Sequence, residues 1–591
     1  MLKILRNLTV KQVALLVISI IFIVLQVWLD LKLPDYMADI TRLVETPGSE
    51  LSEIISAGVK MLVCAGGSLC SAVIVAVLAA RAGTGFAAVL REKIFSKVQD
   101  FSLAEIGQFS TPSLITRSTN DVMQVQFLII MGLQAIVKAP IMAVWAVIKI
   151  YDKGFDWMVA TGVSVVVLVV IVSIGIAIVT PKFRRMQVLT DDLNRVTREN
   201  LTGIAVVRAY NAEDYQENKF DAANNILTKT NLFAYRTLAT LMPSIQLIMN
   251  GLTLAIYWIG TYLIANAVLS GKLTLFSNMV VLSSYAIMVI MSFMLLLIVF
   301  MLYPRAQVSA SRILEVLNTP VSIKDGPETA LARLDKTGKT TQGEVEFKNV
   351  SFAYPDAASP VLKDISFKAT KGQTVAFIGA TGCGKSTLIN LIPRFYDATA
   401  GEVLVDGVDV KDYKLSTLRD KIGYVSQKAV LFSGSVSSNI SYGDMGESLE
   451  EQDILDAVDT AQSADFVREL DGGIGATVAQ GGTNFSGGQK QRLSIARAIA
   501  RNPEILIFDD SFSALDYKTD RALRDALNKH CKKSTRLIVA QRIGTIMDAD
   551  LIIVLHDGKM VGKGTHKELL KTCDEYKQIA LSQLSEQELV A

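Results

Sequence analysis

The chain has few charged residues, and the shortage is confined to one part of it. Of its 591 residues only 20% are charged, whereas 50% are hydrophobic. Residues 1 to about 310 hold long apolar runs with little charge, and the remainder has the ordinary mixture of a water-soluble protein. A chain of this length also exceeds what one hydrophobic core organises. The sequence therefore predicts a membrane part followed by a water-facing part.

Three further absences exclude other classes of protein. The net charge is +2 and there is no basic stripe of the kind that binds nucleic acid, so we expect no nucleic-acid partner. The five cysteines have neither metal-binding nor disulfide spacing, and a reducing cytosol suits the second part. No small-residue cleavage site ends the first apolar run, which is therefore interpreted as an uncleaved membrane anchor.

Six apolar segments are long enough to cross about 30 Å of hydrocarbon at about 1.5 Å per residue. They cover residues 13–33, 54–80, 127–150, 158–179, 238–263 and 275–302. Basic residues precede the first span and follow the second and fourth spans, which places these ends in the cytoplasm. We expect a multi-pass protein of the cell (cytoplasmic) membrane with both termini in the cytoplasm.

The connections after the second and fourth spans are long, at roughly 45 and 55 residues. Their mixture of charged and apolar residues is typical of helices, so the spans are expected to continue as cytoplasmic arms, the first with a break near Pro112. The tips are predicted at residues 105–109 and 207–211. The arms are either solvated hairpins or, as we favour, contacts to a soluble domain that needs a mechanical link to the membrane.

Polar side chains inside the predicted spans are costly in lipid. Lys138 lies deepest among them, and it either faces a central pathway or is paired within the helix bundle. The full set is Lys60, Gln134, Lys138, Gln246 and Asn250.

A phosphate-loop motif lies in the water-facing part. A buried strand is predicted at residues 374–378, and a helix opens directly after the motif. Glycines in the pattern G-x-x-x-x-G-K-[ST] let successive N–H groups face phosphate oxygens. Lys385 is expected to reach the β- and γ-phosphates of ATP, and Ser386 to bind Mg²⁺. The motif comprises Gly379, Ala380, Thr381, Gly382, Cys383, Gly384, Lys385, Ser386 and Thr387.

Two more residues sit where a nucleotide site needs them. Tyr354 ends a predicted strand and either stacks on adenine or is an ordinary edge-strand residue. Gln427 ends another strand, where its amide can reach Mg²⁺ or the attacking water.

A second phosphate-binding helix start is predicted further on. A serine and two glycines open this helix, and two such sites make sense if two domains face each other head to tail. Strand 505–509 then ends in Asp509, which is positioned for Mg²⁺, and Asp510 follows it. The residues of the helix start are Ser486, Gly487, Gly488 and Gln489.

In this order behind six spans, and with the loop Ser513-Ala514-Leu515-Asp516, these motifs resemble an ABC exporter half-transporter. The similarity covers nearly the whole chain, including residues 116–122 and 199–204. It implies a six-helix, all-α transmembrane domain (1–318), a linker (319–342) and an α/β P-loop ABC nucleotide-binding domain (343–591). It also implies that Tyr354 stacks on adenine, that Gln427 couples the γ-phosphate to the arms, and that two halves exchange arms.

Two positions depart from the family. Asp510 stands where the resemblance implies a catalytic glutamate, and Gln541 where it implies a switch histidine. Losing one methylene withdraws the carboxylate by about 1.5 Å, and misplacement near 1 Å can cost roughly 10²-fold in rate. A glutamine donates a hydrogen bond but has no titratable proton. Gln480 and Gly481 also replace the glutamate and arginine that usually precede the signature.

These changes weaken hydrolysis and spare binding. We therefore expect one subunit of a heterodimeric ATP-driven exporter of amphipathic drugs or lipids, similar to bacterial multidrug exporters. Its own site hydrolyses ATP poorly, and residues 486–489 complete the competent site of a sister chain that supplies glutamate and histidine. The alternatives are a homodimeric exporter with Asp510 as base, and a nucleotide-gated channel or sensor. The mostly apolar spans do not identify a substrate.

Overall fold

The computed structural model describes residues 1–46, 48–327, 342–355, 357–443 and 449–585. The chain divides into two compact units, Met1–Lys97 with Pro112–Asn318, and Val98–Thr111 with Thr319–Ala591. The predicted linker, 319–342, lies largely outside the described residues.

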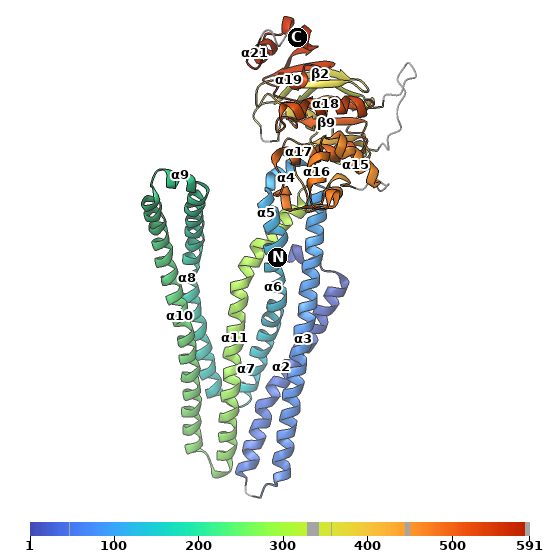
Figure 1. The fold of residues 1–591 in the computed structure, drawn as a ribbon. Helices are drawn as coiled ribbons and strands as arrows, with labels where there is room; N and C mark the ends of the chain where they lie inside the picture. The colour runs from blue at the N-terminus through green and yellow to red at the C-terminus, as the bar shows by residue number, and fades with distance from the viewer. Residues whose placement is uncertain (47, 328–341, 356, 444–448, 586–591) are drawn as a thin grey trace. The chain divides into compact units, whose positions relative to one another are not determined.

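The first unit is built from helices (Figure 1). Within the described residues, six helical stretches are long and apolar enough to cross a membrane. Each predicted span falls on one of them, so the prediction of an all-α part with six spans is confirmed. The elements are α1 (Leu2–Leu5), α2 (Val10–Glu45), α3 (Leu51–Gln99), α5 (Thr111–Thr116), η1 (Arg117–Asp121), α6 (Val122–Leu133), η2 (Gln134–Lys138), α7 (Ala139–Tyr151), α8 (Phe155–Thr202), α9 (Ile204–Ala209), α10 (Glu213–Asn266) and α11 (Leu269–Asn318), where η1 and η2 are π-helical.

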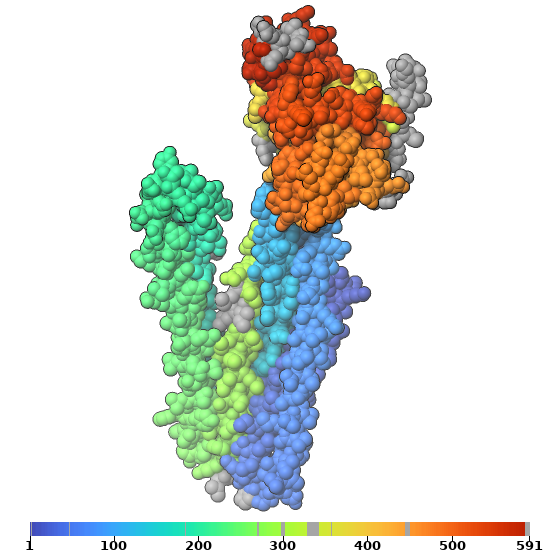
Figure 2. Space-filling view, viewed as in Figure 1, coloured from blue at the N-terminus to red at the C-terminus, as the bar shows by residue number. Residues whose placement is uncertain are grey.

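Helices α8 and α10 form a long pair whose ends are joined by α9. Gly175 permits the close approach, because a Cβ there would lie 2.8 Å from Leu241. Near α9, Glu199 accepts hydrogen bonds from Arg195 of α8 and from Lys219 of α10, both at 2.9 Å. Figures 1 and 2 show that the α9 end of this pair stands apart from α6 and α11. The predicted tip 207–211 lies at this end.

The break in the first arm is wider than the one expected near Pro112. Helix α3 ends at Gln99, α4 covers Leu103–Phe109, and Ser110 has a positive φ of 57° before α5 begins. Pro112 lies in the first turn of α5, where the missing N–H costs nothing. The predicted tip 105–109 thus forms a helix of its own, within the second unit.

Helix α4 is fixed to the segment that follows α11. Ser102 caps the helix by accepting from the N–H of Ala104 at 3.1 Å. The buried carboxylate of Glu105 accepts from the N–H of Ser102 at 2.7 Å and from the N–H of Ser322 at 3.3 Å. One carboxylate therefore joins the arm tip to the start of the soluble part.

The residues at the two ends of the π-helical turn η1 form hydrogen bonds to α11. Arg117 donates to the carbonyl of Arg312 at 2.8 Å and to the carboxylate of Glu315 at 2.7 Å. Asp121 accepts from the hydroxyl of Ser309 at 2.7 Å. Arg117 and Asp121 are both buried, so the motif at residues 116–122 fastens the end of α11 to the first arm.

The second unit is an α/β domain. Among its described residues, the main sheet has six strands in the order β12-β11-β3-β10-β9-β6, and the strands from β11 to β6 are parallel. The strands are β1 (Val345–Phe352), β2 (Leu362–Ala369), β3 (Thr374–Ile378), β4 (Ala400–Val405), β5 (Val408–Asp409), β6 (Ile422–Val425), β7 (Gly434–Ser435), β8 (Thr477–Val478), β9 (Ile505–Asp509), β10 (Thr535–Val539), β11 (Leu551–His556) and β12 (Lys559–Gly564).

Helices cover this sheet, and a smaller antiparallel sheet, β2-β1-β4-β5, adjoins it. Strands β9 and β10 are buried throughout, as expected for the inner strands of a parallel sheet that is covered on both faces, although they include Asp509, Thr535 and Arg536. The helices are α4, α12 (Lys385–Asn390), α13 (Leu415–Asp420), α14 (Val436–Ile440), α15 (Glu451–Thr460), α16 (Ala464–Glu469), α17 (Gly487–Ala500), α18 (Tyr517–His530), α19 (Ile543–Ile546), α20 (His566–Thr572) and α21 (Asp574–Leu581), with the 3₁₀ turns η3 (Gly473–Gly475) and η4 (Gln480–Gly482).

Lys138 is paired within the helix bundle, which was one of the two alternatives that the sequence left open. Its ammonium lies 3.1 Å from the carboxylate of Asp30 in α2, which also accepts from the hydroxyl of Ser68. Asp30 falls inside the first predicted span and was missing from the predicted set of polar span residues. A second pair, Lys149 with Asp35 at 2.8 Å, joins α7 to α2, whereas Lys138 of the first pair belongs to η2.

We predict that Lys138→Met destabilises the protein by about 3 kcal/mol, because it leaves the Asp30 carboxylate without its cation in a medium of low polarity. The double variant Asp30→Asn with Lys138→Met should recover most of this loss. Thermal unfolding in detergent measures both. Lys60→Met is the matched control, since this exposed lysine of α3 has no ion pair recorded among the described residues. Equal effects of Lys138→Met and Lys60→Met would contradict the prediction.

Candidate functional site

The predicted site residues gather where the parallel strands end. The carboxyl ends of parallel strands share one edge of a sheet, which is where α/β proteins bind ligands. In the register of the sheet Val539 pairs with both Phe377 and Asp509, and Val425 pairs with Phe508. The segments that follow β3, β6, β9 and β10 therefore leave the same edge. They carry the phosphate loop, Gln427, Asp510 and Gln541.

The loop after β3 is a cradle of backbone. Gly379, Gly382 and Gly384 have positive φ values of 154°, 85° and 99°, which favour glycine. A Cβ on Gly379 would lie 2.1 Å from the carbonyl oxygen of Leu555, whereas a Cβ on Gly382 would project into open space. A side chain at position 379 is therefore excluded by the neighbouring backbone, whereas a side chain at position 382 would occupy the open space beside the loop.

Lys385 opens α12 and turns its ammonium back over this loop. Its Nζ donates to the carbonyl oxygens of Gly379 at 2.7 Å and Ala380 at 2.9 Å. The side chain is buried beside the equally buried Cys383. A positive charge is therefore held at the mouth of the cradle.

The next two residues of α12 link the loop to its neighbours. The hydroxyl of Ser386 donates to the carboxylate of Asp509 at 2.7 Å, so an oxygen from helix α12 and one from the end of strand β9 lie together. The hydroxyl of Thr387 lies 3.0 Å from that of Tyr354. The Tyr354 ring also packs edge-on against Phe352 and Tyr396, which gives it a structural contact beside its predicted role at the adenine.

Asp510 is the meeting point of the loops that follow β6, β9 and β10. One of its carboxylate oxygens, Oδ2, accepts from the amide of Gln541 at 2.8 Å and from the amide of Gln427 at 3.4 Å. Its backbone has a positive φ of 48°. Burial raises the pKa of Asp510, although these hydrogen bonds and the charge of Lys385 oppose the rise.

The pKa of Asp509 is also raised, chiefly by burial. The hydrogen bond from Ser386 opposes this shift, and the neighbouring charge of Asp510 adds to it. A cation near these carboxylates would lower the pKa of both Asp509 and Asp510, because it favours the ionised forms.

The Ser-Gly-Gly-Gln segment opens α17 as predicted. Ser486 is the N-cap and accepts from the N–H of Gln489 at 3.3 Å, while the Gln489 side chain accepts from the N–H of Ser486 at 2.9 Å. A Cβ on Gly487 would meet nothing within 4 Å, and one on Gly488 would crowd the carbonyl of Ala514 at 3.3 Å. The capped helix start and its bare glycines leave N–H groups available to an anion.

Residues that lie outside the predicted motifs connect these loops. Gln491 of α17 donates to the carbonyl of Ser426 at 3.3 Å, beside Gln427. Arg542 donates to the carbonyls of Ser513 and Leu515, each at 3.1 Å, and so holds the Ser-Ala-Leu-Asp loop against the segment after β10. All three contacts end on backbone oxygens, which leave no signal in a sequence. Gly481, where the family has arginine, has a φ of 67° in η4, a conformation that favours glycine.

The two parts of the chain each match a known family. Residues 16–293 match the ABC transporter transmembrane region, and residues 362–513 match the ABC transporter family. The chain belongs to the ABC transporters. An ABC transporter ATP-binding protein of Mycobacterium bovis, named as uncharacterized, is 40% identical over 539 residues, 90% of each chain.

Relatives with a named activity are more distant. An ATP-dependent lipid A-core flippase of Pseudomonas syringae pv. tomato is 32% identical over 83% of this chain and 79% of its own. The structure of a bacterial Atm1-family ABC exporter with ATP bound superposes with a TM-score of 0.79 at 24% identity, covering 97% of this chain and 99% of that one. This likeness shows the fold, and the chain has the architecture of an ABC exporter half-transporter.

The site fits the ligands of an ABC domain. A glycine cradle with a lysine over it suits the phosphates of ATP, and the adjacent oxygens of Ser386 and Asp509 suit Mg²⁺, which takes one or two protein ligands besides phosphate and water. No cluster of three or more His, Cys, Asp or Glu side chains able to hold a metal occurs in the described part of the chain. A metal shared with phosphates needs no such cluster.

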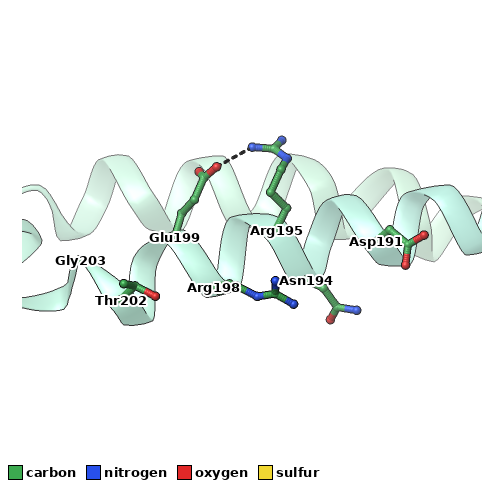
Figure 3. Close-up of a pocket in the computed structure, with 7 residues that line it drawn as sticks. All are labelled: Asp191, Asn194, Arg195, Arg198, Glu199, Thr202 and Gly203. Atoms are coloured by element: carbon green, nitrogen blue, oxygen red, sulfur yellow. Dashed lines mark hydrogen bonds and ion pairs between the residues drawn. The ribbon is translucent and has the colours of Figure 1, made fainter. Parts of the chain in front are cut away.

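A separate hollow of about 620 Å³ lies on the α8 arm of the ABC transporter. Its lining comes from α8 and the glycine that ends it, and Figure 3 shows Arg195 turned toward Glu199. It includes none of the predicted nucleotide residues. Its lining residues are Asp191, Asn194, Arg195, Arg198, Glu199, Thr202 and Gly203, and the last residues of this set overlap the family-like segment 199–204.

We predict that Ser386→Ala lowers ATP affinity in the presence of Mg²⁺ by about tenfold, because the metal loses one of its two protein oxygens. In excess chelator the variant and the wild type should bind ATP equally. Titration with a fluorescent ATP analogue, with and without chelator, measures this. Ser366→Ala in strand β2 is the control. A defect that persists in chelator would show that Ser386 acts through the fold and not through the metal.

Proposed function

We propose that this chain is one subunit of a heterodimeric ATP-driven exporter of amphipathic or hydrophobic compounds, with an ATP site of its own that hydrolyses poorly. The observation that carries the proposal is the bond between Gln541 and Asp510 at 2.8 Å. A catalytic base must offer a free oxygen to the attacking water. Here one of the two carboxylate oxygens, Oδ2, accepts from the amide of Gln541 and is approached by that of Gln427, and the carboxylate lies one methylene short of the family's glutamate.

Binding of ATP is retained in this proposal. Lys385 and the backbone of residues 379–387 hold the phosphates, Ser386 and Asp509 hold Mg²⁺ with Gln427 close to it, and Tyr354 stacks on adenine. The cradle, the buried ammonium and the Ser386–Asp509 contact support these roles. The site keeps every group that binds ATP and changes only positions 510 and 541, which serve hydrolysis. It therefore binds ATP but hydrolyses it slowly.

The competent site lies between this chain and a sister half-transporter that carries glutamate and histidine. Ser486, Gly487, Gly488 and Gln489 of this chain complete that site by donating N–H groups to the partner's ATP. The α8–α10 pair, whose α9 end stands apart from α6 and α11, supports an exchange of arms between the two halves.

Lipids or amphipathic drugs are the proposed substrates, moved across the cell membrane with both termini of this chain in the cytoplasm. The lipid A-core flippases among the relatives favour a lipid. An almost wholly apolar hollow of about 380 Å³, lined by α7, α8 and α11, supports a hydrophobic ligand. The basic residues that follow the second and fourth spans support the orientation.

A homodimeric exporter is the second candidate, and the raised pKa of Asp510 favours it. A carboxylate of higher pKa is the stronger base, which offsets part of its shorter reach. In that case the isolated chain turns over ATP, and Asp510→Ala abolishes the activity.

We predict that the isolated chain in lipid nanodiscs hydrolyses ATP slowly, and that Asp510→Glu combined with Gln541→His raises the rate at least about tenfold by restoring reach and a titratable switch. Phosphate release measures the rate. The control combines Asp548→Glu with Gln578→His, which places the same residue types at exposed positions. If the wild-type chain alone hydrolyses ATP fast and Asp510→Ala abolishes this activity, the heterodimer proposal is wrong and the homodimer proposal takes its place.

Transport itself is tested with the reconstituted complex of both chains. ATP-dependent uptake of a fluorescent phospholipid or amphipathic dye into inside-out vesicles is expected. Nucleotide binding without any uptake would favour a channel or sensor over an exporter.

A further inference from the structure

A glutamine near the end of the described chain contacts the switch segment twice. The side chain of Gln583, which follows α21, donates from Nε2 to the carbonyl oxygen of Gln541 at 2.8 Å. Its Oε1 accepts from the N–H of Ile543, also at 2.8 Å. A single amide thus bridges the backbone on both sides of Arg542, in the way that a neighbouring strand would.

The contact satisfies a backbone group that otherwise needs water. Ile543 is the first residue of the four-residue helix α19, and the N–H groups at a helix start have no partner inside the helix. Arg542, the N-cap residue of α19, makes no side-chain cap. Gln583 supplies the missing acceptor from a position 40 residues further along the chain.

The glutamine is itself fixed by the core of the domain. Tyr576 of α21 is fully buried, and its hydroxyl lies 2.6 Å from Nδ1 of His566. Beyond the helix, the N–H of Gln583 donates to the carbonyl of Ala580 at 3.1 Å, and the partly buried Leu584 packs against the buried hydrophobic cluster that contains Ile543 and Tyr576. The Gln583 amide therefore starts from an anchored backbone.

Gln541 connects Gln583 to the carboxylate of Asp510. The side chain of Gln541 donates to Asp510 at 2.8 Å, while its carbonyl is held by Gln583. Arg542 ties the same segment to Ser513 and Leu515 on its other side. The direction of the residue-541 side chain is set by a backbone that is clamped from both sides.

We propose that Gln583 is a positioning residue for ATP hydrolysis, which fixes the switch backbone so that the side chain at position 541 meets the carboxylate at position 510. The proposal needs only the ATPase activity of an ABC domain. It concerns the site that this chain's own residues 510 and 541 form, so a composite site with a sister chain's catalytic residues does not depend on Gln583.

The test compares Gln583→Met, which keeps the length of the side chain and removes both hydrogen bonds, with Gln578→Met at an exposed position of α21. The full-length chain in nanodiscs is used, both as the wild type and with Asp510→Glu and Gln541→His. ATP turnover is measured in whichever of these two backgrounds hydrolyses ATP faster. Gln583→Met should lower kcat about tenfold with the KM for ATP unchanged. Hydrogen exchange at the Ile543 amide should accelerate about tenfold, because its acceptor is gone.

A third variant separates the two bonds. Gln583→Glu keeps an acceptor for Ile543 and turns a carboxylate oxygen toward the Gln541 carbonyl, so turnover should fall while the Ile543 amide stays protected. Gln578→Met should change neither quantity. The proposal is overturned if Gln583→Met behaves like Gln578→Met, if turnover falls without faster exchange at Ile543, or if KM rises and the melting temperature drops together, which would mark a general loss of fold.

Discussion

One buried carboxylate organises the nucleotide edge of this protein. Asp510 directly follows strand β9 in a left-handed backbone conformation, and a buried charge in that position is costly unless donors reach it. The donors come from Gln427 after β6 and Gln541 after β10, so loops from three strands are brought together by the need to solvate a single group. The phosphate loop joins the same edge through the bond between Ser386 and Asp509.

Separate polar contacts also hold each of the two units together. In the second unit, Gln491 ties the signature helix to the backbone beside Gln427, and Glu105 ties the arm tip α4 to Ser322. In the first unit, Arg117 and Asp121 of η1 hold α11, whose last residue leads directly into the segment that Glu105 binds. Most of these bonds join a charged or amide side chain to backbone or to an opposite charge. Such contacts have discrete partners, and they shift as units rather than deform smoothly.

The elements with strong local signals were predicted from the sequence, and the residues that pair across the fold were not. Strands β3 and β9 have the predicted bounds because a short, mostly apolar run between turn residues favours a buried strand. The six spans followed from length and hydropathy alone. The partner of Lys138 did not, since Asp30 lies in another helix and the register between helices depends on packing that no local pattern encodes. Arg542 and Gln583 bind backbone carbonyls and an N–H, so their targets have no side-chain identity to read.

The two departures from the family are best understood as one change. An aspartate at position 510 withdraws its carboxylate toward β9, and the flexible amide of a glutamine at position 541 follows it to 2.8 Å. The bond suits a neutral donor, because a buried carboxylate of raised pKa is satisfied by an amide without the cost of a second buried charge. A histidine beside the same short carboxylate would bring in a group that titrates near neutral pH and can add a second charge to the buried site. Aspartate and glutamine therefore stabilise each other, and restoring only one of the family's residues would leave the other without a matched partner.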